Sequence, residues 1–97
     1  MIGEIRVDTE RLRSHADIIR QEQRYVYELL DRLRYAQSLA DPDISGRIQS
    51  VIRKANQLSD HCAAMISGLE ETSDIFDKLI ENIGTILTDQ IEASRPD

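Results

Sequence analysis

The sequence predicts an all-α protein, an antiparallel two-helix hairpin that pairs into a four-helix bundle. Three observations support this prediction. Apolar residues recur every three or four positions along two long stretches, which is the period of a coiled coil. The segment Asp41-Pro42-Asp43-Ile44-Ser45-Gly46 is where that pattern stops and restarts. The second stretch is apolar over a wider face than one partner helix covers, which favours a second neighbour.

The composition fits a single domain, residues 1–97, built on long helices. The chain is 40% hydrophobic, 31% charged and only 4% aromatic, with no Trp, and is too apolar for a disordered chain. A hairpin of 97 residues buries one seam rather than a globular core. So small a fold is expected to be marginally stable alone.

The first helix is expected at about residues 8–39. Residues 1–7 alternate loosely between apolar and polar and are expected to form an extended lead-in, with Asp8 as the helix N-cap. Apolar residues then follow in alternating steps of four and three, with Gln23 as the one polar member. This stripe comprises Leu12, Ala16, Ile19, Gln23, Val26, Leu30 and Leu33. The residues that widen it are Ile18, Leu29 and Ala36.

Residues 40–46 are expected to form the turn, with Ile44-Ser45-Gly46 as its glycine-bearing part. Pro42 lacks an N–H and disfavours the α conformation at Asp41. The side chains of Asp41, Asp43 and Ser45 can accept the free amide protons of a starting helix. One helix therefore ends here and another begins, and folding the second back on the first hides both apolar stripes.

The second helix is expected at about residues 47–93, and its apolar residues fit two adjacent heptad seams. One antiparallel partner covers a stripe of about two residues in seven, so the second seam requires another neighbour. Gly68 and Gly84 lie within this helix, where they mark a close helix approach, a weak point, or positions that a long helix tolerates. The apolar residues are Ile48, Val51, Ile52, Ala55, Leu58, Cys62, Met65, Ile66, Leu69, Phe76, Leu79, Ile80, Ile83, Ile86, Leu87 and Ile91.

The second helix should overhang the first. At 1.5 Å per residue, expected lengths of about 47 and about 31 residues correspond to ~70 Å and ~46 Å. The overhang, from about Ile75 to Ile91, carries too much apolar surface for a soluble monomer. The expected interface residues are Leu12, Ile19, Val26, Leu30, Leu33, Ile52, Leu58, Ile66, Leu69, Phe76, Leu79, Ile80, Ile83 and Leu87.

Charge and hydropathy exclude several classes of partner. The net charge is -6, and residues 1–40 hold seven acidic and seven basic groups, so the acidic excess lies after the turn. An acidic end repels phosphate and anionic lipid, so we expect no nucleic-acid binding. The N-terminus has no apolar signal region and no stretch approaches about 20 apolar residues. We therefore expect no stable membrane insertion, and export, if it occurs, without a cleaved signal peptide.

The sequence offers no catalytic or metal-binding constellation. Consecutive helical residues point about 100° apart, so His61 and Cys62 make a poor nucleophile–base pair. His15 adds no i,i+4 ligand set to them, and Cys62 falls on the apolar stripe as a small buried hydrophobe. The seven arginines among residues 6–34 are interleaved with acidic residues, which favours a solvated face over an anionic-substrate site. We expect no enzyme activity and no cofactor.

The arrangement resembles the WXG family of small type VII secretion proteins, ESAT-like helical hairpins of about this length. The features that carry the resemblance are Ile5-x-Val7-Asp8 before the first helix, the length of that helix, and a glycine-bearing turn at mid-chain. Ile44-Ser45-Gly46 stands where the family has Trp-x-Gly. The family's C-terminal Tyr-x-x-x-Asp/Glu signal has no match after the second helix, and Tyr27-x-x-x-Asp31 has its spacing within the first.

The resemblance implies a non-enzymatic protein that is a type VII secretion substrate or a targeting and chaperone partner of a secreted effector. Its partner would be a second copy, a related hairpin, or the helical N-terminal domain of an LXG-type toxin. Its location would be the bacterial cytoplasm before export and the medium afterwards. Two alternatives stay open: a self-assembling hairpin resembling a type III secretion needle subunit, and a small helical mutase-like enzyme that uses the first-helix arginines.

Overall fold

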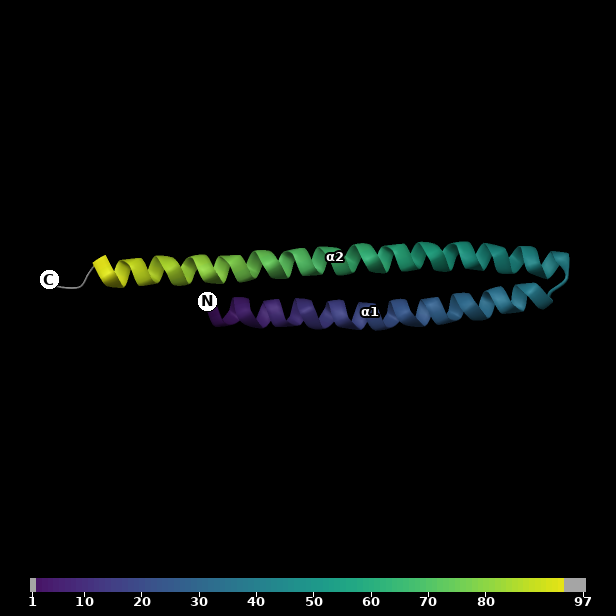
Figure 1. Cartoon of the computed structure of the whole chain (residues 1–97), viewed down its shortest axis with the longest axis horizontal. Coiled ribbons are helices and arrows are strands. Elements are labelled where there is room, and N and C mark those ends of the chain that lie inside the picture. The colour runs from purple at the N-terminus through teal and green to yellow at the C-terminus, as the bar shows by residue number, and fades with distance from the viewer. Residues whose placement is uncertain (1, 94–97) are drawn as a thin grey trace.

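The protein is a rod of two antiparallel helices. The computed structural model describes residues 2–93, which form α1 (Ile2–Leu39) and α2 (Pro42–Ala93), joined at one sharp reversal (Figure 1). The rod measures 86 × 15 × 14 Å and its radius of gyration is 23.1 Å. A compact domain of this size has a radius of gyration of about 13 Å. The predicted all-α hairpin is confirmed, and its core is a seam along the rod.

Helix α1 begins earlier than its sequence suggested. Residues 2–7 are helical, so the extended lead-in is wrong for them, and Asp8 lies inside the helix rather than at its N-cap. Ile5 and Thr9 continue the three-and-four spacing of the seam upstream of Leu12. Ile5 is half-buried and Thr9 is only 3% exposed, so the helical conformation places both against α2. Packing against the second helix outweighs the weak local preference for an extended start.

The turn is shorter than expected because α2 begins at Pro42. Asp41 is its N-cap: the Ile44 N–H donates to Asp41 Oδ1 at 2.9 Å, and the Ser45 N–H donates to the Asp41 carbonyl at 2.8 Å. Pro42 occupies the first helical position, where its fixed φ suits the helix and its missing N–H is not needed. Ile44, Ser45 and Gly46 therefore form the first turns of α2 instead of a turn motif. No glycine in the described chain has a positive φ.

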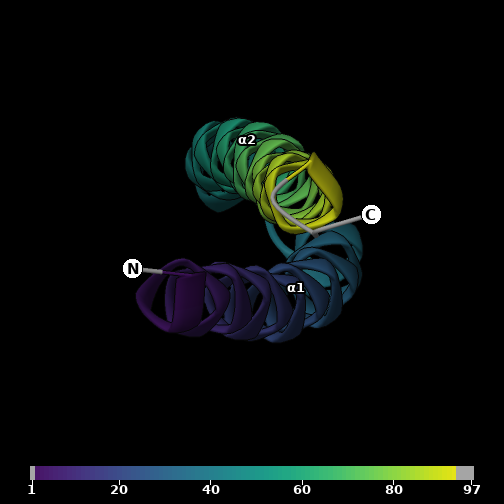
Figure 2. The same ribbon diagram turned by 90° about the vertical axis from the view of Figure 1, so that its left-hand side faces the viewer.

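The predicted stripe of α1 packs along α2. A cluster of Val26, Leu30, Ile52 and Ala55 lies near the turn, with Leu33 and Ile48 against it. Seen along the rod, the two helices wind about each other (Figure 2). That winding keeps residues spaced 3.5 apart on average in contact over the whole length.

Polar groups interrupt the seam at intervals of fourteen residues. Gln23 Nε2 donates to the Ser59 carbonyl at 3.2 Å. Fourteen residues further along α1, Gln37 Nε2 donates to the carbonyl of Ser45, which lies fourteen residues earlier in α2, at 3.3 Å. A polar residue at a seam position specifies register, because sliding the helices would leave it unpaired among apolar side chains.

A third polar layer lies fourteen residues from the Gln23 layer, toward the open end of the hairpin. The repeat brings Thr9 level with Ser73, and both are almost fully buried, at 3% and 1% exposure. Each hydroxyl donates to a carbonyl of its own helix, at 2.9 Å in both cases. These layers are therefore satisfied within each helix and leave no described buried side-chain polar atom without a partner.

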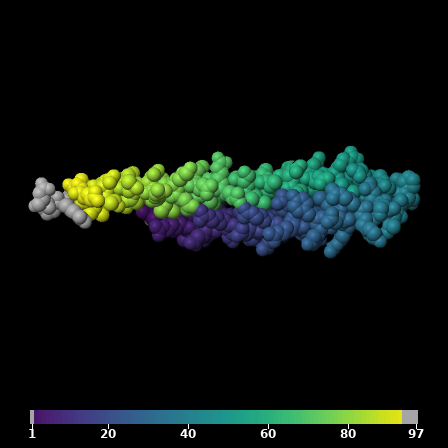
Figure 3. Space-filling model, in the orientation of Figure 1, coloured from purple at the N-terminus to yellow at the C-terminus, as the bar shows by residue number. Residues whose placement is uncertain are grey.

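Helix α2 projects past the N-terminal end of α1, as predicted (Figures 1 and 3). It has 52 residues against 38 in α1. Because α1 starts at Ile2, it shields part of the expected overhang, and Phe76, Ile80 and Ile83 are half-buried. From residue 84 to residue 93 every residue is exposed. Neither helix of the described chain is long and apolar enough to cross a membrane.

Candidate protein-interaction surface

The two flanks of the seam differ in chemistry. If the seam residues occupy heptad positions a and d, with Thr9 and Ser59 at a, the e positions lie on one flank and the g positions on the other. In an antiparallel pair of helices the e positions of both helices face each other, and so do the g positions. Each flank is therefore built by one column of residues from each helix.

The e positions form a charged flank. Arg13 pairs with Asp77, and Arg20 pairs with Glu70. The second pair lies seven residues later in α1 and seven earlier in α2, which matches the antiparallel register. All four side chains are roughly half exposed, so each pair contributes about 1 kcal/mol at most. They favour the observed register, because sliding one helix by a heptad breaks one of the two pairs.

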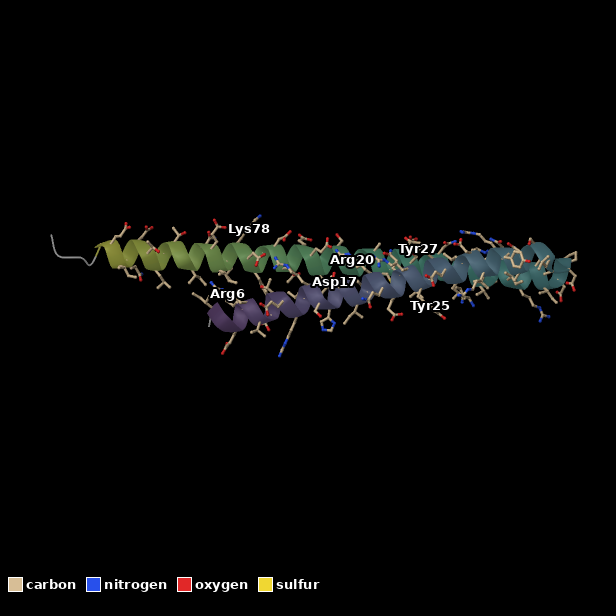
Figure 4. The ribbon with its side chains drawn as sticks, turned by 60° about the horizontal axis from the view of Figure 1, so that its bottom comes forward. Arg6, Asp17, Arg20, Tyr25, Tyr27 and Lys78 are labelled. Atoms are coloured by element: carbon tan, nitrogen blue, oxygen red, sulfur yellow. The ribbon has the colours of Figure 1, made fainter. Side chains whose placement is uncertain are left out.

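An open groove of about 460 Å³ lies on the charged flank beside Arg20. Figure 4 labels Arg20 and Tyr27, two side chains of α1 that line this groove. The Arg20 guanidinium is already engaged by Glu70 and by Asp17 Oδ1, at 2.8 Å from the latter. Ser67 and Glu70 both line the groove, but Glu70 is engaged by Arg20 and not by the Ser67 hydroxyl. Its walls are Arg20, Gln23, Arg24, Tyr27, Ala63, Ile66, Ser67 and Glu70.

The g positions of α2 form what we call the apolar column. Its members recur at a strict seven-residue interval and are all apolar except Thr72. The six apolar members are between 42% and 56% exposed, although side chains of this kind are usually buried. The apolar column is Ile44, Val51, Leu58, Met65, Thr72, Leu79 and Ile86.

Thr72 does not break the apolar column. Its Oγ1 donates to the Gly68 carbonyl of its own helix at 2.8 Å. The hydroxyl is thus satisfied without solvent, and a partner that covers this position meets no unpaired donor. The column is therefore a continuous surface that a partner can dehydrate at little cost.

Helix α1 adds apolar side chains to the same flank. Leu29 occupies a g position and is half-buried, and Ile18 and Tyr25 lie beside that column, 51% and 56% exposed. Figure 4 shows Tyr25 on the side of α1 away from α2. The other g positions of α1 include Asp8, His15 and Glu22, so the flank opposite the ion pairs is apolar along α2 and mixed along α1. An exposed apolar surface of the extent seen on α2 marks a protein-interaction site.

Most of the expected interface residues lie in the hairpin's own seam. Only Leu58, Leu79 and Leu87 among them are exposed. The residues buried or half-buried within the hairpin are Leu12, Ile19, Val26, Leu30, Leu33, Ile52, Ile66, Leu69, Phe76, Ile80 and Ile83. The apolar members of the column that are absent from the expected interface set are Ile44, Val51, Met65 and Ile86. The signal that identifies them is the seven-residue interval, which runs unbroken from Ile44.

The candidate reactive residues are separated by the fold. Cys62 is buried in the seam at 8% exposure, whereas His61 is exposed. No cluster of three or more His, Cys, Asp or Glu side chains that could hold a metal ion occurs within residues 2–93. Arg13, Arg20 and Arg34 each pair with a carboxylate, so these cations do not converge on one site.

No protein-family model, curated protein or solved structure matches the chain. Its class follows from its own geometry: an antiparallel coiled-coil hairpin with ion pairs on one flank, the apolar column of α2 on the other, and a projecting end of α2.

Proposed function

We propose that the protein is a non-enzymatic, WXG-like helical hairpin that works by binding another helical protein. The observation that carries the proposal is the apolar column, because it lies outside a seam that is already complete. An apolar surface about 63 Å long, from 42 residue steps of 1.5 Å, needs a partner to remove it from water.

In this proposal the bound hairpin serves type VII secretion, as a substrate or as a targeting and chaperone partner of an exported effector. The support is the shape and length of the hairpin, with two long antiparallel helices joined by a tight turn. Burial of the apolar column in the complex would complete the four-helix bundle expected from the double seam of α2.

The first test is the molar mass of the purified chain, measured by light scattering across a concentration series. Self-association or a stable complex with a co-expressed hairpin supports the proposal. A monomer that stays monomeric, binds no apolar dye and captures no hairpin partner contradicts it. The secretion role is tested separately, by comparing the protein in the medium of a bacterium with an active or an inactivated type VII system.

A second candidate is a self-assembling subunit that resembles a type III secretion needle hairpin. The projecting end of α2 favours it, because Ile86 and Leu87 are exposed there, beyond the cover of α1. Contacts through an end, unlike contacts through a two-fold flank, continue indefinitely and give filaments. Concentration-dependent filaments in electron micrographs support this candidate, and a closed complex of fixed mass excludes it.

A further inference from the structure

We propose that the apolar column binds the same column of a second copy of this chain, with the two α2 helices antiparallel and Met65 of both copies at the two-fold axis. This inference rests on the proposed function, because it names the partner of the surface on which that function depends.

The apolar column can pair with an antiparallel copy of itself. Met65 is its middle member, with three positions on either side. Antiparallel pairing about Met65 sets Ile44 against Ile86 of the partner subunit and Val51 against Leu79 of the partner subunit. Leu58 then meets Thr72 of the partner subunit, whose hydroxyl is already bonded within its helix. Every contact occurs twice, as a two-fold interface requires.

The charges along α2 favour a second copy in this orientation. Residues 44–58 contain three basic groups, of which Arg47 is paired with Asp43. Residues 70–92 contain one basic group and seven acidic groups, two of which are paired with arginines of α1, so five acidic groups are left there. Antiparallel pairing places the basic end of each helix beside the acidic end of the other. The same helix thus supplies both the positive and the negative half of the contact.

The same charges disfavour a dimer in which the two α2 helices are parallel. It would bring two segments of residues 44–58 together, each with the cations Arg53 and Lys54, and two acidic segments of residues 70–92. Like charges within a Debye length of about 8 Å at physiological ionic strength repel each other. The apolar column could pair in either direction, so the charges decide between them.

The contact has the extent that a stable dimer needs. A column about 63 Å long and about 10 Å wide buries roughly 630 Å² on each copy, or roughly 1,260 Å² in total. Specific interfaces begin at about 1,200 Å² in total.

Cysteine cross-linking between differently tagged copies tests both the surface and the direction. In a Cys62→Ser background, one copy carries Val51→Cys and the other carries Leu79→Cys. Mild oxidation is expected to link the two different copies, and to link Met65→Cys copies to each other. Ala64→Cys, one position away and exposed on the outer side of α2, is the matched control and is expected to remain unlinked. Circular dichroism at 222 nm checks that each variant retains the helical hairpin.

Each outcome bears on the inference. Links between two Val51→Cys copies, or between two Leu79→Cys copies, in place of the mixed product would overturn the antiparallel direction. A dimer by light scattering without links at these positions overturns the apolar column as the self-contact. A monomer that nevertheless binds a different hairpin overturns the second copy as partner and leaves the proposed function standing. A monomer that binds no hairpin overturns both.

Discussion

At the scale of single residues, stability depends on a few buried side chains in a seam one layer thick. Leu30 is 2% exposed and lies in the cluster with Val26, Ile52 and Ala55. Replacing it in Leu30→Ala removes three carbon atoms and leaves a cavity, so we expect the free energy of unfolding to fall by about 2–4 kcal/mol. Urea unfolding followed by circular dichroism measures this. Tyr35→Ala, at a 69% exposed position on the same helix, is the control and should change little.

The N-cap of α2 is a second single-residue determinant. Asp41→Ala removes the acceptor of the Ile44 N–H at the only reversal in the described chain. The unfolding free energy should fall by about 1 kcal/mol, within the 0.5–2 kcal/mol known for such caps. Asp41→Asn keeps an oxygen in the same place and should retain most of the stability. Equal losses in both variants, measured by thermal unfolding, would show that the cap hydrogen bond is not what stabilises this end.

At the scale of the helices, the sequence was enough to predict their number, direction and seam. The alternating spacing of Leu12, Ala16 and Ile19 identified the buried face of α1, because an apolar period of 3.5 residues places these side chains on the side of a coiled-coil helix that faces its partner. The predicted start of the first helix was wrong, because tertiary packing there outweighs the local sequence signals. Asp8 has the chemistry of an N-cap, but Ile5 before it and Thr9 after it gain more by packing on α2 as a helix.

The surface was harder to predict than the fold. The sequence shows that α2 has two apolar seams, but periodicity alone does not tell which of them α1 covers. In the structure α1 packs on the seam that contains Ile52 and Ala55, with the ion pairs of Arg13 and Arg20 on one flank, and the other flank is left exposed. Those pairs depend on the register, which the polar layers at Gln23 and Gln37 specify. The apolar column therefore became identifiable only after the helices were placed.

Gly68 weakens α2 as a helix, because glycine has a lower helix propensity than alanine. An added Cβ at this position meets no atom within 4 Å, so no close approach within the chain requires a glycine. We expect Gly68→Ala to raise the free energy of unfolding by about 1 kcal/mol. The measurement is chemical unfolding at low protein concentration. Gly68→Pro, which breaks the helix, should lower it by about 3 kcal/mol or more. A loss of stability in Gly68→Ala would reveal a partner packed closely on that face.

At the scale of the whole molecule, the stability of the hairpin should be inseparable from its association. A single seam with half-exposed ion pairs gives a marginal fold, and a second copy on the apolar column adds binding energy to the folded state alone. The thermal midpoint should therefore rise with protein concentration, by roughly 4 °C for each tenfold increase, given an unfolding enthalpy of about 0.7 kcal/mol per residue.

Met65→Glu provides the decisive comparison for this dependence. Met65 is 56% exposed and lies outside the seam, so the substitution should leave the isolated hairpin folded. It places two carboxylates together at the two-fold axis of the dimer, where each is removed from water without a partner. The concentration dependence of the midpoint should disappear, and the midpoint should match that of the original chain at high dilution. Ala64→Glu adds the same charge on the outer side of α2 and should preserve the dependence. If both variants melt as the original chain does at every concentration, the stability of this protein does not depend on the apolar column.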